Sequence, residues 1–418
     1  MRNLLKPLPI AALAACASLP SFAGEDVGCR STITPDGERA ADPVVWVNVE
    51  DDEDRRFQDA WCVAVGPAVR YAPPARSAVA TGVPGGGDTV EAPGLPRIDS
   101  LLVVAFNAHI GDADLERLVG DIRSGAFTGE PVEHFALLMQ EVHRSGDVVP
   151  PADELPAGAQ TASAVESPPG RDDIVDDARA LGLHLLYLPS MRSGVLPETQ
   201  EDRGNAILST LPLHAPRGLE LPMGLQRRVT ALAWVNAADN TGVPWQLGLA
   251  SAHLDNAEVN QLLGSLGAIR GRQAGGLVRM LPDEGALVVG GDFNTWFGET
   301  MERAYRRMRH HFPYPREPQS QPTAIRLGEG RVLDYLFFRG PRGWSLDDAR
   351  APSMYGSDHY PVYGWVVVGE GRREVPAGEP ATEAEAPQAD APDAAGAGVA
   401  GADVTGADVT GADVTGAE

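Results

Sequence analysis

An acid and an amide stand together at the end of one apolar run in the sequence. The run 287–294 passes through Gly290 and Gly291 to Asp292 and Asn294, which are two positions apart. Because successive side chains of a strand point to opposite faces, we expect Asp292 and Asn294 on the same side. They could hold an attacking water beside a phosphorus-centred transition state, although Asp and Asn also build ordinary turns after strands. The two glycines lack a Cβ, so we expect them to let a substrate or metal approach the backbone.

Asp334 and His359 form a second candidate pair. Asp334 is embedded in the apolar run 331–338, and His359 precedes the last apolar run, 362–368. A buried carboxylate costs free energy unless it is paired, and a histidine is a natural partner. Held by Asp334, the imidazole of His359 would have a fixed tautomer and a raised pKa, as a general base requires. The alternative is a structural pair that closes the last strand.

Three further apolar runs carry a polar residue at or near their ends: Asn107, Glu141 and His253. Mg²⁺ prefers oxygen ligands and typically takes one or two carboxylates plus the phosphate of a substrate. Glu141 is therefore the best candidate metal ligand, with Asn107 close to it. Each residue alone has a structural alternative, as a strand end or a hydrogen-bonded core side chain. Five such coincidences in one chain favour a common site.

Together these segments resemble the endonuclease/exonuclease/phosphatase superfamily, which contains pancreatic deoxyribonuclease, abasic-site endonucleases and neutral sphingomyelinases. The motifs, in the family's order, are Asn107, Gln140-Glu141, Arg203-Gly204-Asn205-Ala206-Ile207-Leu208-Ser209, His253, Gly291-Asp292-Phe293-Asn294, Leu333-Asp334-Tyr335 and Ser357-Asp358-His359-Tyr360-Pro361. The resemblance covers residues 98–369, and no catalytic position is missing. It implies an α/β fold, a four-layer sandwich of two mixed β-sheets flanked by helices.

The resemblance also implies a metal site and phosphate contacts. Glu141 would hold the divalent cation, aided by Asn107 and by Asp358 as an additional candidate. The implied cofactor is Mg²⁺, with Mn²⁺ or Ca²⁺ as alternatives. Arg203 and Asn107 would contact the phosphate of the substrate.

The remaining family positions would carry the chemistry of an in-line displacement. His359, polarised by Asp334, would act with Asp292 to activate and orient the water. Asn294 and His253 would stabilise charge on the phosphoryl oxygens, and a second role implied for His253 is protonation of the leaving group. Donors that are already oriented stabilise such a transition state without reorganisation.

The N-terminus has the pattern of a secretory signal. Two basic residues precede the apolar stretch 8–19, and small residues fit a cleavage site after Ala23. We therefore predict that residues 1–23 are a signal peptide and that the protein is exported, to the periplasm or the extracellular space. The alternative is a lipoprotein signal that anchors Cys16 in the outer membrane, but the stretch 7–15 is short for its apolar core. No other stretch is apolar enough to span a membrane.

Export makes the cysteines informative. With Cys16 removed or lipidated, Cys29 and Cys62 remain as an even pair without other metal ligands nearby in sequence. In an oxidising compartment such a pair predicts a disulfide. Two unpaired buried thiols are the alternative.

Composition divides the chain into regions. Residues 24–97 form a small disulfide-bonded, β-rich N-terminal module and a Pro/Gly-rich linker, with strands expected at 44–49 and 61–65. Residues 98–369 form the catalytic domain. Residues 370–418 form an acidic tail with three Gly-Ala-Asp-Val-Thr copies, which has too little apolar bulk to fold and is predicted to be disordered.

Apolar spacing predicts both helices and strands within the catalytic domain. Residues 115–122 and 259–281 have apolar side chains at helical spacing. The strands expected at 206–208, 229–235 and 246–253 follow one another without an intervening helix, which indicates antiparallel neighbours.

The charge of the chain bears on its partners. The net charge of −24 opposes tight non-specific binding to nucleic acid, whose affinity comes largely from phosphate neutralisation. Basic side chains nevertheless cluster shortly after Asn294: Arg303, Arg306, Arg307, Arg309, His310 and His311. In a helix, Arg303, Arg306, Arg307 and His310 would share one face. That face could neutralise a phosphate backbone or an anionic headgroup, or it could be a solvated face that pairs with the protein's many acids.

Three functions follow from these observations. The first is a secreted metal-dependent phosphodiesterase that acts on nucleic acid, and the second is a lipid or small-molecule phosphoesterase of the sphingomyelinase type. The third, a non-catalytic surface-binding protein, is disfavoured because every catalytic residue type is present. We favour a nuclease, since the sequence has no strong apolar hairpin of the kind that membrane-acting relatives carry. A phosphodiester is the expected partner, nucleic acid rather than phospholipid; we expect no stable protein partner and a monomer.

Overall fold

The apolar runs form strands that are covered on both faces. In β4 (Ser100–Asn107), Leu101 and Val103 pack into a core between two sheets, whereas Leu102 and Val104 pack against helices. Neighbouring side chains of a strand point in opposite directions, so a strand buried on both faces needs an unbroken apolar sequence. Continuous apolar runs therefore indicate the central strands of a layered fold.

The computed structural model describes residues 28–48, 52–74, 94–161, 171–193, 200–256, 267–296, 301–317, 320–326 and 328–369. All of these residues belong to one compact unit. The predicted signal peptide (1–23), the predicted tail (370–418) and much of the predicted linker lie outside the described residues.

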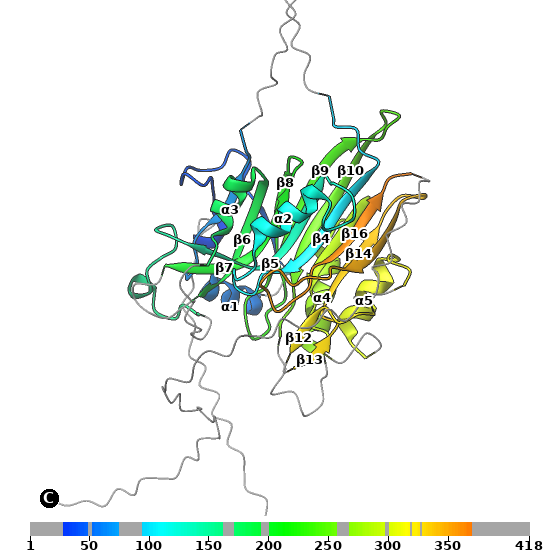
Figure 1. Ribbon diagram of the computed structural model, residues 1–418. Helices are drawn as coiled ribbons and strands as arrows, with labels where there is room; N and C mark the ends of the chain where they lie inside the picture. The colour runs from blue at the N-terminus through cyan, green and yellow to red at the C-terminus, as the bar shows by residue number, and fades with distance from the viewer. Residues whose placement is uncertain are drawn as a thin grey trace, which may run out of the picture. The chain divides into compact units, whose positions relative to one another are not determined.

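Two mixed β-sheets contain most of the strands (Figure 1). Sheet A has the spatial order β1 (Thr32–Ile33), β3 (Ala68–Tyr71), β6 (His184–Ser193), β7 (Glu201–Ser209), β5 (Phe135–Ser145), β4, β16 (Val362–Val367) and β15 (Ser345–Arg350). Sheet B has the order β14 (Asp334–Arg339), β11 (Ala286–Asp292), β10 (Pro244–His253), β9 (Val229–Ala238), β8 (His214–Glu220) and β2 (Val45–Asn48). Parallel and antiparallel pairs occur in both sheets, for example β4 with β5 and β10 with β9. The predicted pair of mixed sheets is confirmed.

Helices pack on the outer faces of the sheets and complete the four layers. α2 (Leu115–Ser124) and α3 (Ile174–Leu181) cover sheet A, and α4 (Ala268–Met280) and α5 (Arg303–His311) cover sheet B. α2 confirms the first predicted helix, and α4 confirms the described part of the second. Among the described residues, no helix combines the length and the apolar character that a membrane crossing requires.

The prediction that three successive strands are antiparallel neighbours is correct for one pair of strands only. β9 and β10 pair antiparallel in sheet B, but β7 pairs with β5 and β6 in sheet A. Both sheets bury both faces of their central strands, so an apolar pattern does not reveal the sheet to which a strand belongs. The chain passes from sheet A to sheet B between β7 and β8.

The N-terminal residues extend both sheets. β2 pairs parallel with β8 at the edge of sheet B, and β3 pairs antiparallel with β6 in sheet A. The segment predicted as an N-terminal module therefore packs as part of the same layered unit.

The strand predicted at 61–65 is wrong. Trp61 and Cys62 end the helix α1 (Asp52–Cys62). The buried residues Asp54, Gln58 and Trp61 recur at helical spacing. The first buried positions of this helix are polar, Asp54 and Gln58, so an apolar pattern does not reveal it.

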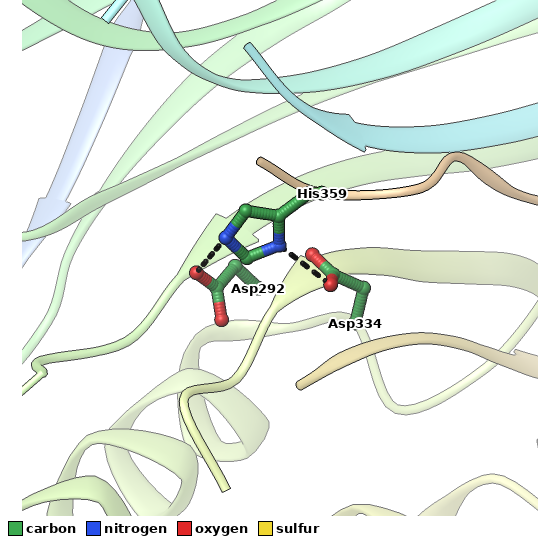
Figure 2. Close-up of side chains that lie close together, drawn as sticks. All are labelled: Asp292, Asp334 and His359. Atoms are coloured by element: carbon green, nitrogen blue, oxygen red, sulfur yellow. Dashed lines mark hydrogen bonds and ion pairs between the residues drawn. The ribbon is translucent and has the colours of Figure 1, made fainter. Parts of the chain in front are cut away.

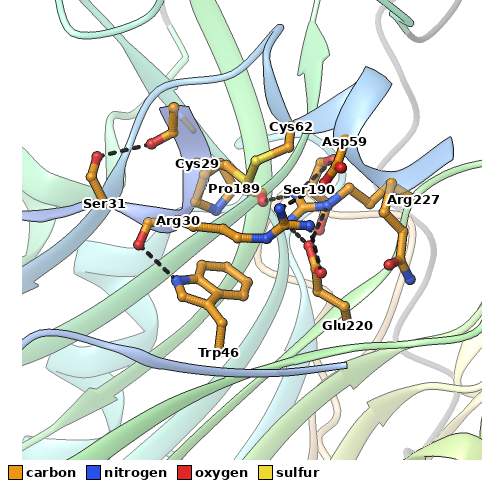
Figure 3. The surroundings of a disulfide bond; sticks show 12 residues. Cys29, Arg30, Ser31, Trp46, Asp59, Cys62, Pro189, Ser190, Glu220 and Arg227 are labelled. Carbon is orange, nitrogen blue, oxygen red and sulfur yellow. Dashed lines mark hydrogen bonds and ion pairs between the residues drawn. A yellow bond between two sulfur atoms is a disulfide. The ribbon is translucent and has the colours of Figure 1, made fainter. Parts of the chain in front are cut away.

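A disulfide and a buried ion network hold the N-terminal segment in place (Figure 3). Cys29 is bonded to Cys62, 33 positions away, and both are buried, which confirms the predicted pairing. Beside them, Arg30 donates to Asp59 Oδ1 at 2.6 Å and to Glu220 Oε2 at 2.8 Å. Glu220 lies on β8, so the network joins the N-terminal segment, α1 and sheet B.

Removal of the disulfide should lower the free energy of unfolding. Closing a loop of this length stabilises a chain by about 3–4 kcal/mol in the entropic model. We expect the Cys29→Ser/Cys62→Ser variant to lose that amount, as measured by urea unfolding without reductant. Reductant should abolish the difference from the unsubstituted protein. Equal midpoints and slopes for the two proteins without reductant would contradict the expectation.

Candidate active site

The site lies at one end of the core between the sheets, where inward-facing side chains change from apolar to polar. In β11 the inward row runs from Val288 to Asp292, and in β10 it runs from Leu249 to His253. Asp292 is the register partner of His253 on one side and of Asp334 on the other. Strand alternation thus places three polar side chains in one row across sheet B.

Sheet A contributes a facing row. Asn107 and Gln140 are register partners at the ends of the inward rows of β4 and β5. Asn107 Nδ2 donates to Asp292 Oδ2 at 3.1 Å, and Gln140 Nε2 donates to Ser251 Oγ at 2.9 Å. Two buried hydrogen bonds therefore join the sheets at the site.

Glu141 enters the site through an irregularity in β5. The register with β7 shifts just beyond Met139, and Glu141 has a φ of +52°. A β-bulge re-aims a side chain, and Glu141 Oε1 lies 3.8 Å from His253 Nε2. Burial alone would raise the pKa of Glu141, but the positive charges of Arg203 and Arg228 outweigh it and lower the pKa to about 2. Glu141 is therefore ionised at neutral pH.

His359 and Asp334 form a buried hydrogen-bonded pair (Figure 2). His359 Nδ1 lies 2.7 Å from Asp334 Oδ2, which also accepts from Thr323 Oγ1 at 2.8 Å. The other ring nitrogen of His359 lies 3.8 Å from Asp292 Oδ2. Burial lowers the pKa of His359, but the carboxylates of Asp334 and Asp292 outweigh it and the pKa is raised.

Asp292 is held by neighbours on both oxygens. Oδ1 accepts from the backbone N–H of Asn294 at 2.8 Å, and Oδ2 accepts from Asn107. Burial, followed by the negative charge of Asp334, raises the pKa of Asp292 to about 6. A carboxyl with this pKa accepts a proton more readily than an ordinary aspartate, as a base near neutral pH requires.

Arg228, a residue that the sequence analysis missed, determines the state of His253. Its Nη1 lies 3.0 Å from His253 Nδ1, and a guanidinium only donates, so Nδ1 accepts and Nε2 carries the ring proton. Asn294 Nδ2 lies 3.2 Å from Nε2, but two donors cannot form a hydrogen bond with each other. The amide of Asn294 therefore donates to the carbonyl oxygen of Leu254 at 3.0 Å. Burial and then the charge of Arg228 lower the pKa of His253 well below its usual value. His253 is therefore a neutral donor.

Arg326 is the second residue that the sequence analysis missed. It ends β12 (Ala324–Arg326), which pairs with β13 (Glu329–Arg331) in a small hairpin. Its Nη2 lies 2.7 Å from His359 Nε2, and its Nη1 forms an ion pair with Asp358. Asp358, the additional candidate metal ligand, thus faces an arginine. No spacing in the sequence indicates where such a hairpin folds.

The motif around Arg203 has two roles in the structure. The charge of Arg203, on β7, lowers the pKa of both Glu141 and His253. Asn205 Nδ2 donates to the carbonyl oxygens of Val229 at 2.8 Å and Ser251 at 3.2 Å. Asn205 therefore links sheet A to sheet B next to the site.

The interpretation of Gly290 and Gly291 as openings for a ligand is wrong. Both glycines are buried. A Cβ on Gly291, whose φ is +144°, would lie 1.9 Å from the carbonyl oxygen of Ala252, and a Cβ on Gly290 would lie 2.6 Å from Leu336. The absent side chains leave room for neighbouring protein atoms, so both glycines are required by packing.

The residues at the site fit a hard divalent cation. Glu141 supplies an ionised carboxylate and Asn107 an amide oxygen, and Mg²⁺ prefers oxygen ligands. Asp292, Asp334 and His359 also bring one ligand atom each within 4.8 Å of one another. Because Asp334 Oδ2 is already hydrogen-bonded to His359, we interpret that group as a relay that orients the imidazole.

Comparison with known proteins identifies one family. The profile of the Endonuclease/Exonuclease/phosphatase family matches residues 104–359. No curated protein sequence matches the chain significantly.

Several solved structures are similar to the chain at low sequence identity. An endonuclease/exonuclease/phosphatase from Beutenbergia cavernae is 17% identical over 65% of this chain and 72% of its own, with a TM-score of 0.47. Truncated TDP2 from Caenorhabditis elegans is 13% identical over 64% of this chain and 98% of its own, with a TM-score of 0.35. Beta toxin from Staphylococcus aureus is 15% identical over 63% of this chain and 99% of its own, also with a TM-score of 0.35.

The pKa of His359 should lie above the usual histidine value, and the pKa of His253 should lie below it. In NMR titrations of the protein with EDTA, we expect the pKa of His359 above 6.5 and that of His253 well below it. Asp334→Asn removes the charge that raises the pKa of His359, so it should lower that pKa by about 1 unit or more. The exposed Asp347→Asn should leave it unchanged. A pKa of His359 below 6.5 in the unsubstituted protein would refute this electrostatic account.

Proposed function

The chain belongs to the endonuclease/exonuclease/phosphatase family, and from this premise we propose that it is a divalent-metal-dependent phosphodiesterase that acts on nucleic acid. Members of this family are generally phosphoesterases. The observation that carries the proposal is the convergence of Glu141, His253, Asp292 and His359 at one end of the inter-sheet core.

Glu141 and Asn107 are the proposed ligands of the cation. A bound divalent cation would offset negative charge on the phosphate oxygens during in-line displacement. Glu141 is suited to this role because its pKa of about 2 keeps it charged. Asn107 is already oriented by its hydrogen bonds to Asp292 and to the backbone N–H of His109.

Asp292 and His359 are the proposed groups that activate the water. The pKa of each residue is raised. The two side chains face each other in the site, with Asp292 Oδ2 3.8 Å from His359 Nε2. Asp334 holds the imidazole through Nδ1, so Nε2 is left to accept a proton. In the structure Nε2 accepts from Arg326 Nη2 at 2.7 Å, and the charge of Arg326 opposes but does not cancel the rise in the pKa of His359.

His253 and Asn294 are the proposed donors to the phosphoryl oxygens. The proton on His253 Nε2 faces Asp292 and Glu141 at 3.6 and 3.8 Å, inside the same space. Because the pKa of His253 is far below neutrality, we assign it hydrogen-bond donation rather than protonation of the leaving group. Such preoriented donors each contribute about 100-fold or more to a rate.

Nucleic acid is the proposed substrate because the site is surrounded by guanidinium groups. Arg203, Arg228 and Arg326 contribute positive charge to Glu141, His253 or His359. One guanidinium group can donate two parallel hydrogen bonds to the oxygens of a phosphate. The buried disulfide agrees with an exported protein, so we propose action outside the cytoplasm.

Loss of Asp292 or His359 should abolish turnover. The purified protein would be offered plasmid DNA, RNA, sphingomyelin and bis-(p-nitrophenyl) phosphate with Mg²⁺ or with EDTA. We expect hydrolysis of DNA or RNA and of the small diester, and a decrease of about 100-fold or more in Asp292→Ala and His359→Ala. Asp347→Ala, an exposed aspartate on β15, is the matched control. Full activity of Asp292→Ala would overturn the mechanism, and turnover of sphingomyelin alone would overturn the nuclease assignment.

Loss of Glu141 should weaken metal binding. Glu141→Gln keeps the size of the side chain but removes the charge, so we expect the Kd for Mn²⁺ to rise by about 10-fold or more in calorimetric titration. Glu133→Gln, an exposed residue before β5, should bind Mn²⁺ as the unsubstituted protein does. Unchanged Mn²⁺ affinity in Glu141→Gln would exclude Glu141 as a ligand.

A further inference from the structure

A basic pocket lies between α4 and α5, outside the candidate active site. Its volume is about 820 Å³, and it is lined by the basic residues Arg272, Arg303, Arg306, Arg307, His310 and His311. We propose that this pocket, hereafter the α4–α5 pocket, binds the sugar-phosphate backbone of the nucleic acid substrate beyond the scissile bond. The inference rests on the proposed function and assigns its substrate class.

α5 presents its basic residues on a single face. Ala304, Tyr305 and Met308 are buried against sheet B, which fixes the rotation of the helix. Arg303 and Arg307, at helical spacing, are exposed on the opposite face. The face predicted from the sequence therefore forms one wall of the pocket.

Two glycines of α4 let the arginines of α5 lie against it. A Cβ on Gly271 would lie 2.9 Å from Arg303 Cβ, and a Cβ on Gly275 would lie 2.0 Å from Arg307 Nη1. Arg307 Nη1 donates to the carbonyl oxygen of Gly271 at 2.9 Å. The guanidinium of Arg307 is thus held in position by the backbone, which reduces the entropy lost when it binds an anion.

The pocket concentrates positive charge in an acidic protein. The described residues that line it include no acidic side chain, and Arg272 Nη2 lies 3.9 Å from Asp54 Oδ1, outside the lining. Burial, followed by the positive charges of His310, Arg339 and Arg307, lowers the pKa of His311. Like charges brought together repel each other, and a bound polyanion relieves that repulsion.

The pocket lies within reach of a polymer that is held at the active site. α4 and α5 follow β10 and β11, the adjacent parallel strands that end in His253 and Asp292. Nine positions separate Asn294 from Arg303, a length of chain that spans about 30 Å at most. At 3.4 Å per nucleotide of a duplex strand, this distance corresponds to about nine nucleotides or fewer.

The lining fits a nucleic acid rather than a membrane surface. Membrane-binding surfaces combine basic residues with large apolar or aromatic side chains that insert among the lipids. Among the described residues that line the α4–α5 pocket, the apolar side chain is the small one of Ala268. A concave pocket also accommodates a strand better than the surface of a bilayer.

The test separates binding at the pocket from catalysis at the site. The full-length Arg303→Gln/Arg306→Gln variant removes two charges from the pocket, and the matched control Arg56→Gln/Arg342→Gln removes two exposed arginines elsewhere. Anisotropy of a labelled 30-base-pair duplex, measured with EDTA from 50 to 200 mM salt, gives the affinity. We expect the pocket variant to bind about 10-fold more weakly at low salt, with a salt slope reduced by about 2 because each phosphate contact contributes about 0.9.

Turnover distinguishes this inference from the proposed function. The pocket variant should hydrolyse bis-(p-nitrophenyl) phosphate at the rate of the unsubstituted protein, while its KM for the duplex rises. Unchanged duplex affinity in the pocket variant would overturn the inference and leave the proposed function standing. Absence of phosphodiester turnover in every protein would overturn the proposed function, and the anisotropy result would still decide the pocket. Loss of binding to phosphatidylserine vesicles, with duplex binding unchanged, would assign the pocket to membranes and overturn the inference.

Discussion

The hydrogen bond from Asn107 to Asp292 joins the two sheets, and the rest of the site depends on the alignment that it requires. One partner ends a strand of sheet A and the other ends a strand of sheet B. At 3.1 Å the bond is near the upper end of the normal range, so a small sliding of one sheet would break it. The apolar rows behind the site and the bond from Gln140 to Ser251 hold the sheets in place.

Much of the fold and of the site follows from strand alternation. An apolar run that ends in a polar residue predicts a central strand with one polar tip, and Asn107, His253 and Asp292 lie at such tips. Register then brings the tips together, because His253 and Asp292 are partners in adjacent strands and Asp292 and Asp334 are partners in the next pair. The sequence therefore indicates the strands and their polar tips, whereas the register that aligns the tips comes from the pairing of the strands.

Other features depend on contacts that no local pattern encodes. The direction of Glu141 depends on a bulge with a positive φ, and the positions of Arg228 and Arg326 depend on loops and a hairpin that fold over the site. The two glycines of β11 suggest ligand access in the sequence, but they are required because Ala252 and Leu336 occupy the adjacent space. Tertiary packing decides such positions, so a single sequence does not reveal them.

The division of the site between two layers has a consequence for partly folded states. Compact states with loosened side-chain packing keep their strands while their interior swells. Swelling of the interface between the sheets would separate the amide of β4 from the acid of β11, and Glu141 from His253, before any strand melted. The proposed hydrolysis should therefore be more sensitive to interior order than far-ultraviolet circular dichroism, which reports only that the strands persist.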